Sequence, residues 1–113
     1  MHEYSIVQAL LARVGEEARR HGATAVRRVR ISIGELAGVE IELLRTAYET
    51  FRERTPCAQA PLEVNRIEAR WECSDCGRAL ERGGLLRCPE CAKPGRLARG
   101  DEIVLDQLEL EVA

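Results

Sequence analysis

Four of the five cysteines form two Cys-x-x-Cys units whose spacing is typical of a metal site. The units are Cys73-Ser-Asp-Cys76 and Cys88-Pro-Glu-Cys91, and eleven residues separate them. Each unit directs two thiolates at one point, and four convergent thiolates suit tetrahedral Zn(II) with bonds of about 2.3 Å. Such a site leaves no coordination position open to water, so it is structural rather than catalytic. The alternatives are iron in a rubredoxin-like site and four reduced or redox-active thiols.

The amino terminus holds a second set of groups that can bind a metal ion. The amine of Met1 and the amide and imidazole nitrogens of His2 can close adjacent chelate rings on one ion. Ni(II) and Cu(II) accept such nitrogen-rich, tetragonal donor sets, and Glu3 can add its amide or its carboxylate. The alternative is that residue 2 is frayed and without function, as residues near a chain end often are.

The composition favours one small domain and argues against several functions. The chain has 113 residues, of which 45% are hydrophobic, and a net charge of −2, so no overall charge favours nucleic acid or an anionic membrane as a partner. It lacks a run of about 20 apolar residues and a secretory signal pattern, which predicts a soluble, cytoplasmic protein. Two histidines are too few for an open catalytic zinc site. A metal-dependent hydrolase is therefore the weakest hypothesis, and we expect no enzymatic activity.

The cysteine-rich segment 72–100 raises the alternative of a zinc ribbon that docks on nucleic acid or on a protein, without any nickel function. Several arginines make this segment locally basic. No aromatic residue lies between positions 72 and 113 to stack on a base, however, and the segment that follows is acidic. A solvated charged surface explains the arginines better than a nucleic-acid interface does.

The hydrophobic pattern predicts the elements that must position these sites. Apolar residues recur at helical spacing over 4–20 and 39–53, and they alternate as in strands over 26–33, 62–71 and 103–112. The phase of the second strand slips between Val64 and Ile67, which indicates a bulge, and the last strand is expected to lie beside it. The predicted fold is therefore α+β, with two helices on a small, mostly antiparallel three-stranded sheet and an inserted zinc-ribbon module.

The same pattern predicts two domains and ordinary roles for the remaining candidate side chains. Segments 1–71 and 101–113 form the α+β domain, and 72–100 form a module with too few bulky apolar groups to fold without a metal. His21 follows two arginines at a helix C-terminus, where a cation is favourable, and this explains it better than metal ligation. Cys57 is interpreted as a small apolar residue in a turn rather than as a ligand or a reactive thiol.

Several motifs together resemble those of the HypA/HybF family of hydrogenase nickel-incorporation metallochaperones. They are Met1-His2-Glu3-Tyr4-Ser5, Ile33-Gly34-Glu35-Leu36, Tyr48-Glu49-Thr50-Phe51 and the two Cys-x-x-Cys units, and they follow the family's order over essentially the whole chain. The resemblance implies that Ni(II) is held at the amino terminus, where His2 is indispensable and Glu3 contributes. It also implies a further acidic ligand after the first strand, a position that Glu40 occupies here. An exposed or helix N-terminal carboxylate is the alternative role for Glu40.

The resemblance also implies cofactors and partners. Ni(II) is the transported ion, and Zn(II) is structural at Cys73, Cys76, Cys88 and Cys91, in agreement with the spacing argument. The implied partners are a HypB-type GTPase, the large-subunit precursor of [NiFe]-hydrogenase and, in some organisms, urease maturation proteins. Nucleic acid and membrane are not expected as partners, and a monomer or a weak homodimer is expected.

Overall fold

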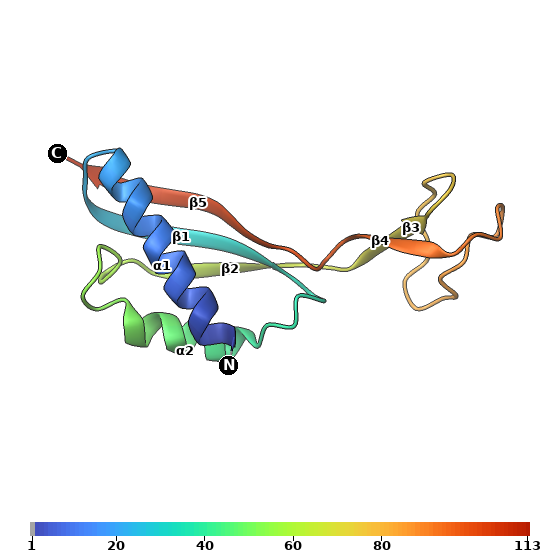
Figure 1. Ribbon diagram of the computed structural model, residues 1–113, viewed down its shortest axis with the longest axis horizontal. Helices are drawn as coiled ribbons and strands as arrows, with labels where there is room; N and C mark the ends of the chain where they lie inside the picture. The colour runs from blue at the N-terminus through green and yellow to red at the C-terminus, as the bar shows by residue number, and fades with distance from the viewer. Residues whose placement is uncertain (1) are drawn as a thin grey trace. The chain divides into compact units, whose positions relative to one another are not determined.

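The computed structural model describes residues 2–113 and shows two helices and five strands in this range (Figure 1). In chain order they are α1 (His2–Arg20), β1 (Ala23–Gly34), α2 (Ile41–Phe51), β2 (Leu62–Ile67), β3 (Arg70–Cys73), β4 (Gly95–Arg99) and β5 (Ile103–Val112). One sheet has the strand order β2-β1-β5, and a second sheet pairs β3 with β4. The predicted α+β class is confirmed. No helix within residues 2–113 combines the length and hydrophobicity needed to cross a bilayer.

The chain divides into two compact units. The helical unit comprises the described part of Met1–Ser32 together with Val39–Asn65 and Val104–Ala113, and the cysteine unit comprises Ile33–Gly38 and Arg66–Ile103. The cysteine unit thus contains the whole of the predicted module 72–100. It also contains residues on either side of that module, the last two residues of β1 and the short segment that follows them.

The core of the helical unit forms where both helices bury one face against β1. In α1 the buried stripe is Val7, Leu11, Val14 and Ala18, which confirms the helical spacing read from the sequence. In α2 the buried residues are Leu44, Ala47 and Tyr48, and in β1 the alternate residues Val29 and Ile31 are buried. Complete burial of one such aliphatic side chain stabilises the fold by about 1.5–3 kcal/mol, so these residues hold the helices on the sheet.

The three-stranded sheet is mixed. The Val26 and Val29 amides donate to the carbonyls of Pro56 and Pro61, both at 3.1 Å, so the chain leading through β2 runs parallel to β1. A parallel neighbour requires a crossover, and α2 provides it. β5 runs antiparallel to β1, since Thr24 bonds the Glu111 carbonyl while Ser32 bonds Asp106. The expectation that the last strand lies beside the strand at 62–71 was wrong, because β1 separates β2 from β5.

The predicted strand 62–71 is interrupted, but not where the hydrophobic phase slips. β2 continues through Ile67 and the break falls at 68–69, just before a register shift between Arg70 and Trp71 in the β3–β4 pair. Two backbones approach closely at the break, since a Cβ on Gly100 would lie 2.5 Å from the Cα of Ala69. Gly100 also has a φ of 118°, a conformation that favours glycine.

Two adjacent leucines of α2 test this description of the core. Leu44 is fully buried, whereas Leu43 is 51% exposed. We expect Leu44→Ala to lower the free energy of unfolding by about 3 kcal/mol, because it removes buried methyl groups and leaves a cavity. Leu43→Ala should change it by less than about 0.5 kcal/mol. Urea unfolding of both variants measures the difference, and equal losses would contradict the assigned helix face.

Candidate metal centre

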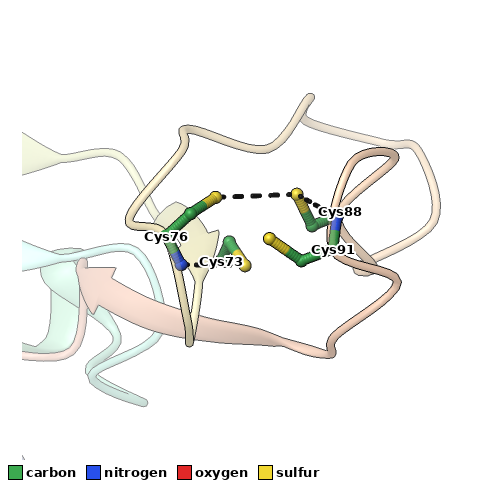
Figure 2. Close-up of side chains that lie close together, drawn as sticks. All are labelled: Cys73, Cys76, Cys88 and Cys91. Atoms are coloured by element: carbon green, nitrogen blue, oxygen red, sulfur yellow. Dashed lines mark hydrogen bonds between the residues drawn. The ribbon is translucent and has the colours of Figure 1, made fainter.

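The four predicted cysteines converge in the cysteine unit (Figure 2). Their sulfur atoms all lie within 4.8 Å of one another, and the Sγ atoms of Cys76 and Cys88 are 3.8 Å apart. A tetrahedral site with metal–sulfur bonds of about 2.3 Å has sulfur–sulfur edges of about 3.8 Å, so the cluster has the dimensions of such a site. In the described range 2–113, these cysteines are the group of three or more His, Cys, Asp or Glu side chains whose ligand atoms already lie close enough together to hold a metal ion.

Each Cys-x-x-Cys unit forms the same type of turn. The residue after the second cysteine donates its amide to the first cysteine's carbonyl, from Gly77 to Cys73 at 3.1 Å and from Ala92 to Cys88 at 2.9 Å. Both donors have a positive φ, 76° for Gly77 and 56° for Ala92. Glycine adopts this conformation without strain, whereas alanine does so at a cost. Gly77 therefore suits its turn, whereas its counterpart in the second turn, Ala92, is strained.

Backbone amides point at the sulfur atoms and favour their charged form. The Sγ of Cys73 accepts from the amides of Cys76 at 3.4 Å and Asp75 at 3.3 Å, and the Sγ of Cys88 accepts from Cys91 at 3.4 Å. The two amide bonds lower the pKa of Cys73 to about 7. The opposite holds at Cys91, whose pKa is raised by interaction with the Cys76 thiol and the other sulfurs. Four thiolates therefore require a cation among them, and these residues fit Zn(II).

Short antiparallel pairings hold the two turns in place. Cys73 is the last residue of β3 and donates its amide to the Arg78 carbonyl at 2.8 Å, and Cys88 donates to the Lys93 carbonyl at 2.9 Å. Cys73 and Cys88 are buried, whereas Cys76 is exposed and Cys91 half-buried. A bound Zn(II) would supply a cross-link between the turns rather than a reactive centre, because all four positions are filled by sulfur.

Glu35 is a residue of the cysteine unit whose role the sequence does not predict. Its carboxylate forms a two-pronged ion pair with Arg82, in the loop between the cysteine turns, and accepts the Ala69 amide at 2.8 Å. The Arg82 contact, with the Ala69 amide, lowers the pKa of Glu35 to about 2. The Ile-Gly-Glu motif marks Glu35, but no sequence signal pairs it with Arg82, which is 47 residues away.

At the amino terminus, the structure brings His2, Glu3 and the backbone of Glu40 together. The Glu3 carboxylate accepts the Glu40 amide at 3.0 Å, and the same oxygen lies 3.6 Å from Nε2 of His2. The hydrogen bond from the Glu40 amide is the main cause that lowers the pKa of Glu3. A hydrogen bond from the amide of Glu3 itself and the nearby His2 lower it further. The Glu40 side chain is exposed and forms no capping hydrogen bond with α2. Met1 lies outside the described residues.

The two remaining candidates lie outside both groups. His21 follows the C-terminus of α1, where its Nε2 is 3.7 Å from a carboxylate oxygen of Glu17. Cys57 is only 1% exposed and lies in the turn between α2 and β2. Burial raises the pKa of its thiol. The interpretation of Cys57 as a packed residue in a turn is confirmed.

The two cysteine turns allow a matched test of backbone strain. Gly77→Ala places a Cβ at a φ of 76°, whereas Ala92→Gly removes one at a φ of 56°. Because metal binding and folding of such a module are coupled, a strain of about 1 kcal/mol appears in the metal affinity. We expect Gly77→Ala to weaken Zn(II) binding about fivefold and Ala92→Gly to strengthen it by a similar factor. Competition with a chromogenic chelator measures both, and a shift in the same direction would contradict the assigned turns.

Comparison with known proteins agrees with this architecture. The family model described as "Hydrogenase/urease nickel incorporation, metallochaperone, hypA" matches residues 1–110. Hydrogenase maturation factor HypA of Shewanella halifaxensis is 42% identical, with 100% of both chains covered, and that of Aquifex aeolicus is 40% identical, with 99% of both covered.

Two solved structures have the same fold over the full chain. The solution structure of the Ni metallochaperone HypA from Helicobacter pylori is 33% identical, covers 100% of both chains and has a TM-score of 0.75. A second solution structure of a HypA protein is 32% identical, covers 100% of this chain and 98% of the other, and has a TM-score of 0.83. Sequence and fold thus agree over the whole length, and the chain belongs to the HypA family of hydrogenase and urease nickel-incorporation metallochaperones.

Proposed function

We propose that this chain carries Ni(II) at its amino terminus and delivers it for the maturation of [NiFe]-hydrogenase. Membership of a metallochaperone family carries this proposal, and the geometry at the start of α1 supports it. The His2 side chain is 57% exposed, so its imidazole is open to an incoming ion and to a protein that accepts it. The Met1 amine and the amide and imidazole nitrogens of His2 are the proposed main donors.

Glu3 is proposed to serve this site in two ways. Its side chain is only 9% exposed, and its Oε2 atom already holds the Glu40 amide. An ionised carboxylate has four acceptor sites, so it can hold this amide and still face the ion. The bond fixes the start of α1 against the segment that precedes α2, so that the Glu40 amide and the His2 imidazole lie near the same Glu3 oxygen.

Glu40 is proposed as a further nickel ligand. Its backbone amide is occupied by Glu3, but its carboxylate forms no cap on α2 and is exposed. The side chain is therefore available to rotate toward an ion at His2. This proposal concerns the Glu40 carboxylate alone. The hydrogen bond from the backbone amide to Glu3 can form with any non-proline residue at position 40.

The rest of the protein is proposed to support the carrier role. The helical unit is the nickel domain, and the cysteine unit is the zinc module, in which Cys73, Cys76, Cys88 and Cys91 hold structural Zn(II). The proposed partners are a HypB-type GTPase and the large-subunit precursor of [NiFe]-hydrogenase, with urease maturation proteins as further partners. The proposed site of action is the cytoplasm, and no catalytic step is assigned to the chain.

A calorimetric titration of Ni(II) into untagged, zinc-loaded protein tests the amino-terminal site. We expect one nickel ion per chain in the unmodified protein, and loss of this binding in His2→Ala and in protein with an acetylated amino terminus. His21→Ala is the matched control, because it removes the other histidine of the chain and should leave binding intact. Zinc content is measured in every sample.

Two outcomes would contradict the proposal. Binding that survives both amino-terminal changes would place nickel elsewhere. An absence of nickel binding in the unmodified protein would instead favour a zinc-ribbon docking module.

Glu40 and Glu42 give a second matched pair, because both carboxylates are exposed and lie at the start of α2. Glu40→Gln keeps the backbone amide that Glu3 accepts but removes the charged oxygen ligand. We expect it to weaken nickel binding at least about tenfold, whereas Glu42→Gln should leave the affinity unchanged. Equal affinities of the two variants would remove Glu40 from the ligand set.

A further inference from the structure

β5 forms one edge of the three-stranded sheet and leaves hydrogen-bonding groups free. The strand order β2-β1-β5 gives it β1 on one side, and no strand pairs with its other side in the described part of the chain (Figure 1). β5 extends over Ile103–Val112, which is long for an edge strand. Such an edge can accept an additional strand through main-chain hydrogen bonds.

The two faces of β5 differ in chemistry. On the face away from the helices, Glu109 bonds Arg28 at 2.9 Å, and Glu111 shares the orientation of Glu109. Leu108 and Leu110 point to the opposite face, toward α1. The exposed edge is thus acidic on one face and apolar on the other.

A groove lies beside the apolar face. Its volume is about 520 Å³, and it is lined by Arg13, Glu17 and His21 of α1 and by residues of β5 that include Leu108, Leu110 and Val112. The two leucines are only half-buried and Val112 is 58% exposed. α1 therefore leaves this part of the sheet uncovered, and apolar side chains of an added strand would fill the groove.

The existing pairing of β5 with β1 shows which kind of strand suits the two faces of β5. β1 presents Arg28 and Arg30 on the face away from the helices, and it buries Val29 and Ile31 on the other face. The Arg28 guanidinium bonds Glu109 of β5. Glu111 makes no ion pair with any of residues 2–113, so an acidic group on the same face remains available to a second basic strand.

We propose that the free edge of β5 is a docking site for an extended segment of a partner protein in which basic and apolar residues alternate. The main chain of the segment pairs with β5, its apolar side chains enter the groove beside α1, and its basic side chains face Glu109 and Glu111. A second copy of this chain does not suit the edge, because antiparallel pairing of two β5 strands would set two acidic rows against each other. The groove and the acidic residues of this site lie in the helical unit, and the site requires no bound nickel.

A ten-residue peptide that copies residues 24–33, Thr-Ala-Val-Arg-Arg-Val-Arg-Ile-Ser-Ile, is the probe. A matched peptide carries glutamate in place of its second and third arginines. We expect the first peptide to bind the zinc-loaded protein, more weakly as salt is raised, and to slow amide hydrogen exchange in β5. The glutamate peptide should not bind. Glu111→Lys should weaken binding about fivefold, whereas Glu49→Lys, at an exposed position of α2, should have no effect.

Several results would overturn the proposal. They are an absence of binding at millimolar peptide, equal binding of the two peptides, and protection that maps to β2 instead of β5. A concentration-dependent dimer that protects β5 in the absence of peptide would show that the edge pairs with a second copy of this chain and not with a basic partner segment. Fluorescence anisotropy, hydrogen exchange and sedimentation separate these outcomes, and none of them depends on the nickel titration.

Discussion

Convergence of four thiol sulfurs is the constraint on which the cysteine unit depends. Among its described residues, the buried apolar side chains are Ile33, Ala69, Cys73 and Cys88, so two of the four are themselves part of the cluster. So small a core cannot offset the conformational entropy lost when this unit folds. Amide groups aimed at Cys73 and Cys88 prepare the sulfurs for ionisation, but four adjacent thiolates repel one another. A cation that removes this repulsion is therefore part of the folding energy of the unit.

The segment after β1 is fixed by carboxylates at both ends. Glu35 joins Arg82 and the Ala69 amide within the cysteine unit, whereas Glu3 accepts the Glu40 amide within the helical unit. Gly38, between these two points, has a φ of 72° and permits the chain to turn there. The few residues from Glu35 to Glu40 thus pass from one compact unit to the other, with a hydrogen-bonded carboxylate securing each end.

Local patterns predicted the elements of this protein, and long-range pairings limited the prediction. Both helices and the strand Ile103–Val112 follow from periodicity, because an amphipathic element shows its buried face within one segment. The cluster of four cysteines could likewise be predicted, because each Cys-x-x-Cys turn is local. Only the approach of the two turns to each other depends on long-range structure. The neighbour of β5 was predicted wrongly because β1 and β2 show similar alternation, and only the crossover through α2 decides their order. The contact of Glu35 with Arg82 has no local signal at all.

The two predicted metal sites differ in burial, and this difference matches their proposed roles. Cys73 and Cys88 are almost completely enclosed, and their sulfur atoms accept backbone amide hydrogen bonds within the two turns. An ion held there leaves only with local unfolding, as suits a structural metal. The His2 side chain is 57% exposed at the end of a helix, and no backbone pairing must open to release a ligand from it. The same small fold thus offers one position suited to retaining a metal ion and, at the proposed nickel site, another suited to surrendering one.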